Sequence, residues 1–150
     1  MRGWLLDTHI LSALANPNGA PSVKAWATGQ PEYRMFLSVL ALAEYDKGIH
    51  NLEPDHPDRS RYIAARDAVG QRFSDRLLSV DDAIVYRWGA ISGEVKRRTG
   101  QAPPLIDTLL AATAIEHDLV LVTRNLQDTR HSGAVIFNPW EDDPSRFPLT

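Results

Sequence analysis

The sequence contains no cysteine, which excludes disulfide bonds and thiolate metal ligands. Any bound metal ion would therefore be held by oxygen atoms or imidazole nitrogens. The sequence also lacks an apolar run near the roughly 20 residues that a membrane helix needs, and its start, MRGWLLDTH, becomes acidic too early for a signal peptide. We therefore expect a soluble, cytoplasmic protein without membrane contact.

Internal repeats and low-complexity tracts are missing as well, which argues against a repeat array. A chain of 150 residues can bury roughly two thirds of the surface that its unfolded form exposes. That is enough for a stable hydrophobic core without disulfide bonds. We therefore expect one domain spanning residues 1–150.

The net charge of −3 argues against a protein that coats nucleic acid without specificity. This balance can mislead, because four carboxylates neutralised by a metal ion would leave −3 + 4 = +1. Most of the clustered cations are interpreted as solvated helix faces. They are Arg59, Arg61, Arg66, Arg72, Arg76, Lys96, Arg97 and Arg98.

Short apolar segments alternate with helical patterns along the chain. The expected strands are residues 3–7, 34–38, 76–80, 119–123 and 134–137. The expected helices are residues 9–16, 22–29, 39–52, 57–73, 81–100 and 103–118. No strand looks like half of a tight hairpin, so we predict a parallel twisted sheet with helices on both faces, a three-layer α/β/α sandwich.

Two of these helices carry apolar stripes at a spacing of three to four residues, and we expect both stripes to face the core. The first stripe is Tyr62, Ala65, Val69 and Phe73, and the second is Ile84, Trp88, Ile91 and Val95. The four tryptophans are interpreted as core or interface residues rather than as platforms for stacking bases. They are Trp4, Trp26, Trp88 and Trp140.

Ligands of parallel sheets bind beyond the carboxyl ends of the strands, so the residues that follow each strand are the functional candidates. The stretch LVLVTRNLQDTR, residues 119–130, is the most informative of these. Its apolar residues stop at Thr123, Arg124 and Asn125, and Asp128 follows. A simple polar turn and the delivery of side chains to a site both explain this pattern.

Asp7 ends the first expected strand, whose other residues are apolar. One interpretation is a cap for the next helix, a role that Asp7 or Thr8 could fill. The other is a functional carboxylate, because Asp7 lies where such a sheet places its sites.

Glu44 lies in the helix at 39–52, with Leu40, Ala41 and Gly48 on the same face. An unpaired carboxylate is costly to bury there. Glu44 therefore has either a partner, for which Lys47 is the nearest candidate, or a function.

Asp107 lies near the start of the helix at 103–118, above a face of small apolar residues that includes Leu110, Ala111 and Ala114. The helix dipole favours an acid in a first turn, which gives Asp107 a purely structural explanation. The small alanines would also let another segment approach this aspartate closely.

Together these acids come from four separate segments and would meet at one end of the sheet. Packed together, carboxylates repel one another and their pKa values rise. A hard divalent cation such as Mg²⁺ or Mn²⁺ relieves this repulsion and prefers oxygen ligands. Such a centre orients phosphate and activates water, so the pattern predicts phosphoryl chemistry.

Four segments resemble the PIN-domain ribonucleases, specifically the VapC- and FitB-like toxins of type II toxin–antitoxin systems. They are LLDTHILSAL at 5–14, LSVLALAEYDKGI at 37–49, IDTLLAATAIEHDLVLVTRN at 106–125 and VIFNPW at 135–140. The resemblance implies a PIN-like fold and endonucleolytic cleavage of RNA that depends on Mg²⁺ or Mn²⁺. It also implies a cognate antitoxin that blocks the site, binding of operator DNA through the antitoxin complex, and a homodimer or dimer of dimers.

On the matched motifs, the resemblance implies that the catalytic acids are Asp7, Glu44, Asp107 and Asp128. It implies Asp7 and Asp107 as the metal ligands. The fourth position stays open between Asp128 and Asn125, because some FitB-like relatives carry aspartate where this chain has Asn125.

Three further residues are expected to contact substrate. Arg124 would bind RNA phosphate, Asn125 would orient water or metal, and Thr8 would position water or a carboxylate through its hydroxyl. Thr123 could act in the same way as Thr8. The chain also departs from the family at His9, where asparagine is more usual, without losing an acid.

Three other classes were weighed against this interpretation. A haloacid-dehalogenase-like phosphatase needs a second aspartate two residues after the first, where this chain has His9. A receiver domain places its acids differently. A module that binds RNA or protein without cutting, acting through its antitoxin complex, remains the main alternative, although the presence of the three main acids weighs against a decayed site.

Overall fold

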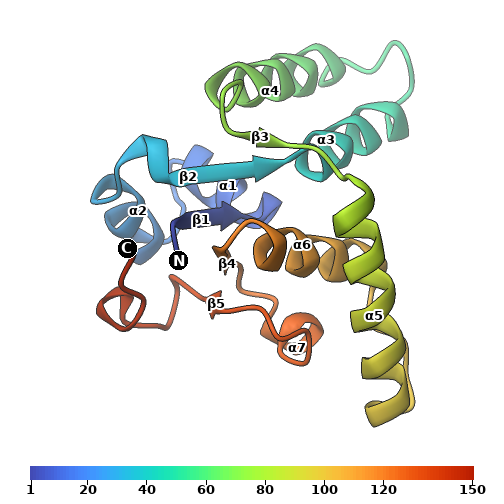
Figure 1. Cartoon of the computed structure of the whole chain (residues 1–150). Coiled ribbons are helices and arrows are strands. Elements are labelled where there is room, and N and C mark those ends of the chain that lie inside the picture. The colour runs from blue at the N-terminus through green and yellow to red at the C-terminus, as the bar shows by residue number, and fades with distance from the viewer.

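The computed structural model describes all 150 residues and contains a single five-stranded sheet (Figure 1). Its strand order is β3-β2-β1-β4-β5, and every neighbouring pair is parallel. The strands are β1 (Gly3–Leu6), β2 (Met35–Ser38), β3 (Leu77–Leu78), β4 (Leu119–Val122) and β5 (Ile136–Phe137). The predicted parallel sheet is therefore confirmed, with β3 and β5 shorter than expected.

The six expected helices are all present, with ends that shift by one or two residues. They are α1 (Thr8–Ala15), α2 (Pro21–Thr28), α3 (Val39–Asn51), α4 (Arg59–Arg72), α5 (Asp82–Thr99) and α6 (Leu105–Glu116). Three short helical segments were not predicted: the 3-10 turns η1 (Glu32–Arg34) and η2 (Pro144–Arg146), and α7 (Leu126–Thr129). None of the helices is both long enough and apolar enough to span a membrane.

Side chains alternate across β1, so the strand packs against a different helical layer on each face. Trp4 and Leu6 belong to the core cluster that includes residues of α1 and α2, whereas Leu5 packs in the cluster that includes α6. Figure 1 shows α1 and α2 on one side of the strands and α6 on the other, with α5 to the right of α6. This arrangement confirms the three-layer α/β/α sandwich.

Helix α6 is buried on two sides because small residues line it. Ala111 and Ala114 contact the sheet, and Ala112 contacts the apolar stripe of α5. All three alanines are fully buried. This close packing fixes the first turn of α6 against the end of the sheet.

The apolar stripes behave differently in the two helices where they were expected. Ile84, Ile91 and Val95 of α5 are buried as predicted. The prediction for α4 was wrong over most of its length, because Tyr62 is 40% exposed and only Phe73, just beyond the helix, is fully buried. Helix α4 instead packs along α3, where Arg66 binds Asp46 at 2.7 Å.

Arg76 also departs from its interpretation as part of a solvated face, since only 8% of the residue is exposed. Its guanidinium donates to the carbonyl oxygens of Glu32 and Met35 at 2.7 and 2.8 Å. Sequence alone does not separate this buried arginine from its exposed neighbours. Arg76 holds the start of β2 rather than serving as a free cation.

Candidate active site

The register of the two central strands brings Asp7 and Thr123 side by side. Leu6 of β1 pairs with Val122 of β4, so the next residue of each strand leaves the sheet at the same level. The Thr123 hydroxyl donates to Asp7 Oδ2 at 2.5 Å, and the Thr123 backbone is held by the Phe137 carbonyl oxygen at 3.1 Å. Both side chains are buried, so one strand end fixes the carboxylate of the other.

Asp7 also caps α1, which is the structural role considered for it. Its Oδ1 accepts from the His9 backbone N–H at 2.7 Å. The alternative cap, Thr8, is instead the first residue of the helix, and its hydroxyl does not cap the helix. Capping and a functional role coexist at Asp7, because its Oδ2 faces Thr123 at the strand ends.

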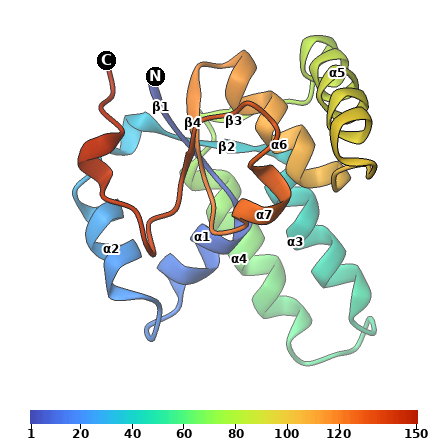
Figure 2. The same ribbon diagram turned by 90° about the horizontal axis from the view of Figure 1, so that it is seen from below.

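Asn125 joins the two remaining aspartates of the cluster. Its side-chain amide donates to Asp128 Oδ2 at 2.8 Å and lies 3.3 Å from Asp107 Oδ2. The Thr123 hydroxyl also accepts from the Asn125 backbone N–H at 3.0 Å, which links this group to Asp7. Helix α7, which carries Asp128, contacts α6, which carries Asp107, and the two helices lie next to each other in Figure 2.

Asp107 lies in the first turn of α6, a position that the helix dipole favours. Burial is the main cause that raises the pKa of its carboxyl above the ordinary value near 3.8. The charges of Asp128, Asp7 and Glu44 raise this pKa further, while His9 opposes them. The expected repulsion among carboxylates therefore acts on Asp107, whose pKa is raised by the neighbouring acids.

Glu44 lies near this group on α3, close enough for its charge to affect Asp107. It is half-buried, and the ion pair with Lys47 that would have explained it is not formed. An ion pair with Lys47 therefore does not explain the position of Glu44.

Two basic side chains flank the acids. The Arg124 guanidinium stacks on the ring of Trp140 at 4.4 Å from the centroid, in the C-terminal segment. His9 was noted in the sequence as a departure from the family but not as a site residue, and its Nδ1 lies 3.3 Å from Asp7 Oδ1. The signal that could have identified His9 is its place two residues after Asp7, in the first turn of α1.

The acids lie near one another without forming a complete set of metal ligands. No three carboxylate or imidazole groups are close enough together to bind one metal ion in this arrangement. The Asn125 side-chain amide lies between Asp107 and Asp128 and donates to both carboxylates. Its amide there offers hydrogen atoms to the carboxylates, as a cation would offer positive charge.

Comparison with known proteins agrees with this architecture. The family model "PIN domain" matches residues 4–131, which contain all the acids described above. Toxin FitB of Neisseria gonorrhoeae is 26% identical over 138 residues, covering 92% of this chain and 99% of that protein. VapC ribonuclease Y4jK of Sinorhizobium fredii is 26% identical over 140 residues, covering 91% and 97% of the two chains.

Solved structures show the same fold. The crystal structure of FitAcB from Neisseria gonorrhoeae superposes with a TM-score of 0.78 at 25% identity, covering 91% of this chain and 98% of that one. The structure of FitAB bound to an IR36 DNA fragment gives a TM-score of 0.82 at 24% identity, covering 93% and 97%. Because the family model matches most of the chain, the protein belongs to the PIN-domain family, and its likenesses fit the FitB-like branch of the VapC toxins.

Proposed function

We propose that this protein is the toxin of a type II toxin–antitoxin system and acts as a metal-dependent endoribonuclease. The observation that carries the proposal is the convergence of Asp7, Asp107 and Asp128 through Thr123 and Asn125 at the carboxyl ends of β1 and β4. Open parallel sheets bind their ligands at this edge. Two relatives are named as VapC ribonucleases, which supports the same activity.

The chemistry of the donor set fits Mg²⁺ or Mn²⁺. The side chains of the cluster are carboxylates with a neighbouring amide and hydroxyl, and the chain has no cysteine that would favour a softer metal. Burial and neighbouring acids raise the pKa of Asp107, so the site holds negative charge that the protein itself does not neutralise. A divalent cation bound there would supply Lewis acidity toward phosphate and water.

Each residue then has a distinct role. Asp7 and Asp107 would bind the cation. The α1 backbone holds one carboxylate oxygen of Asp7, and Thr123 holds the other. Asp128 would accept a proton from the attacking water, and Glu44 would orient water from the α3 side. Asn125 would align Asp107 and Asp128, so the fourth acidic position is assigned to Asp128 with Asn125 as its support.

The partners follow from the same proposal. RNA would be the substrate, and a cognate antitoxin would cover the acids, as the FitAB and VapBC complexes among the structural relatives support. Operator DNA would be bound through that complex, since the FitAB structure contains a DNA fragment. Arg124, already at the strand end, is available to contact RNA phosphate.

One observation favours the rival function, a PIN module that binds without cutting. No three acids lie within reach of one ion, so the site as described would need to close before it could bind metal. The proposed nuclease requires the acids to move closer together around a cation, with Asn125 still aligning Asp107 and Asp128. The rival requires no such movement.

The deciding experiment is expression of the wild type and Asp7→Asn in a bacterium, with new RNA 5′ ends mapped across the transcriptome. We expect growth arrest and discrete cuts with the wild type, and neither with Asp7→Asn. The substitution removes the negative charge of the carboxylate and keeps nearly the same side-chain shape, so the fold should be retained. Purified wild type should lose cutting in EDTA and regain it with Mg²⁺ or Mn²⁺.

Matched variants separate the fourth ligand from its support. Asp128→Asn should abolish cutting, whereas Asn125→Ala should slow it by about tenfold, as expected for loss of a group that orients a metal ligand. No new RNA ends from soluble, folded wild type would support the non-cutting module instead.

A further inference from the structure

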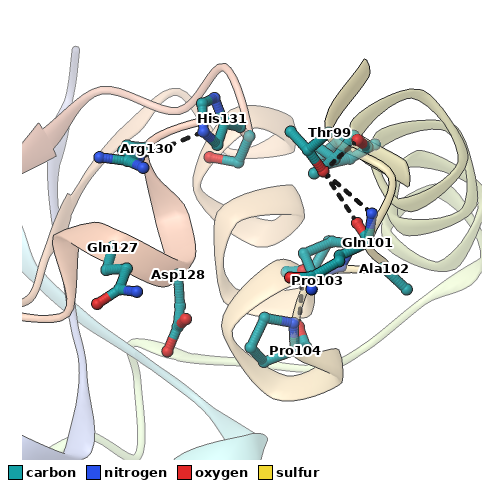
Figure 3. Close-up of a pocket in the computed structure, with 13 residues that line it drawn as sticks. Thr99, Gln101, Ala102, Pro103, Pro104, Gln127, Asp128, Arg130 and His131 are labelled. Atoms are coloured by element: carbon teal, nitrogen blue, oxygen red, sulfur yellow. Dashed lines mark hydrogen bonds between the residues drawn. The ribbon is translucent and has the colours of Figure 1, made fainter. Parts of the chain in front are cut away.

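A cavity of about 210 Å³ lies directly beside the acidic group and shares Asp128 with it. Its walls come from the end of α5, the loop at 99–104 before α6, and the segment that contains α7. Figure 3 shows Gln101, Pro103 and Pro104 on one side of this cavity, and Gln127 and Asp128 on the other. The proposed reaction leaves the cavity unused.

The lining combines a small apolar floor with polar walls. Only three of its 13 residues are hydrophobic, and two of these, Ile91 and Val95, are buried residues of α5. The side-chain amides of Gln101 and Gln127 can each donate and accept hydrogen bonds. The rings of Pro103 and Pro104 add an apolar surface next to them.

Basic side chains lie at one end of the cavity. Arg130 and His131 line it, and their side chains contact each other at 3.2 Å. Arg98 adds a third basic group by donating to the His131 carbonyl oxygen at 3.1 Å. An occupant that carries negative charge at one end and polar groups at the other would match this distribution.

The cavity is held open by hydrogen bonds of its own. The Thr99 hydroxyl ties the end of α5 to the Val95 and Gln101 carbonyl oxygens at 2.8 and 3.1 Å. On the opposite wall, the Thr129 hydroxyl donates to the Asn125 carbonyl oxygen at 2.9 Å. A cavity formed before binding does not require its walls to be ordered by the ligand.

We propose that this cavity is a subsite for one unstacked base of single-stranded RNA, on the nucleotide next to the phosphate that the acidic group attacks. The inference rests on the proposed nuclease function and extends it to base preference. Gln101 and Gln127 would read the base edge, the two prolines would pack on its face, and Arg130 and Arg98 would contact the flanking phosphates.

Size and charge favour a nucleotide over other ligands. The volume is below the roughly 300–1,000 Å³ of clefts that take drug-sized molecules, so it suits a single ring system. Peptide anchors are usually aromatic or aliphatic side chains, for which this lining offers little apolar area. Sequence-specific RNA recognition uses splayed single-stranded bases with hydrogen bonds to their edges, which matches the paired amides and adjacent cations.

The first test measures binding without cutting. Homopolymeric oligonucleotides of A, C or U, about five nucleotides long, would be titrated into the wild-type protein, once in EDTA and once with Ca²⁺. The side-chain amide signals of Gln101 and Gln127 would be followed by NMR. We expect both signals to shift, and to shift more for one base than for the others.

A filled cavity provides the second test. Gln101→Trp should weaken binding of the preferred oligonucleotide by about tenfold, in line with the loss of one stacked base. Gln101→Ala and Gln127→Ala should flatten the differences between bases. Gln71→Trp and Gln71→Ala, at an exposed glutamine on α4, are the matched controls and should change nothing.

The outcomes separate this inference from the nuclease proposal. If wild-type protein cuts RNA and Gln101→Trp cuts with the same efficiency and the same base profile, the subsite is wrong and the nuclease stands. If the two amide signals respond to RNA but nothing is cut, the nuclease is wrong and the subsite stands. Absence of shifts in both buffers would overturn the subsite. Shifts caused by arginine amide and not by RNA would also overturn it, in favour of a peptide partner.

Discussion

Two clusters of ionisable side chains, at opposite ends of the sheet, handle charge in opposite ways. At the amino end of β2, Glu32 receives two hydrogen bonds from Arg72, at 2.7 and 3.0 Å, and a contact from Arg76 at 3.3 Å. At the carboxyl ends of β1 and β4, Asp107 and Asp128 share one neutral amide. The first cluster neutralises itself, and the second does not.

The pKa values record this difference. The hydrogen bond from Arg72 is the main cause that holds the pKa of Glu32 below its ordinary value, against the effect of burial. Burial and neighbouring acids hold the pKa of Asp107 above its ordinary value. A perturbed pKa is therefore not always a signal of function. Only a carboxylate whose pKa is raised by neighbouring acids, such as Asp107, lacks a positive partner within the protein.

The largest effect should come from breaking the self-neutralised cluster. Arg76→Ala should lower the free energy of unfolding by about 3 kcal/mol, because it leaves the Glu32 and Met35 carbonyl oxygens without their donor. Urea unfolding measures this loss, and cutting per folded molecule should not change. Arg61→Ala, at an exposed arginine near Asp58, is the control; similar stability losses in both variants would contradict the comparison.

A smaller change in the free energy of unfolding, with the opposite sign, is expected from removing an acid at the carboxyl ends of β1 and β4. Because the folded pKa of Asp107 is raised, the folded state binds its proton more tightly, and stability falls as pH rises from the ordinary value near 3.8 through the folded pKa. Glu32 behaves in the reverse way, because its lowered pKa contributes stability that is lost as pH falls through that folded pKa.

Asp107→Asn should therefore raise stability in EDTA above this window and remove the corresponding slope. Unfolding measured from about pH 4 to about pH 8 would show the change, and Mg²⁺ should stabilise the wild type but not the variant. A variant with the wild-type slope would show that Asp107 does not carry the unneutralised charge. Its cutting should still fall by about 100-fold or more.

The smallest effect tests the hydroxyl that positions Asp7. Thr123→Val keeps the shape of the side chain but removes the donor to Asp7 Oδ2, and kcat/KM should fall by about tenfold. The Mg²⁺ concentration for half-maximal activity should rise as well. Thr123→Ser restores the hydroxyl and should restore both values; failure of this rescue would assign Thr123 to packing alone.

The sequence predicted the sheet and the main helices because apolar runs and helical periodicity are local signals. Asp7 and Thr123 could be anticipated as neighbours, since residues after parallel strands meet at one edge. Glu44 was a candidate from its place on a small apolar helix face, where an ion pair with Lys47 was the alternative, and the resemblance then implied that it is a catalytic acid. The placement of the acids in one group thus followed from topology together with family pattern.

Other features depend on contacts that no local pattern encodes. Helix α7 has only four residues, so periodicity cannot detect it, yet it brings Asp128 to Asn125. The burial of Arg76 depends on carbonyl groups around residues 32–35, about forty positions away. Tyr62 is 40% exposed although its apolar spacing predicted that it faces the core, because spacing alone does not show which face of a helix is covered.

The bond between Thr123 and Asp7 spans 116 positions of the chain. The chain must therefore be synthesised through Thr123 before this bond can form, and through Asp128 before the acidic group is complete. A nascent chain that stops short of these residues would lack part of the proposed nuclease site.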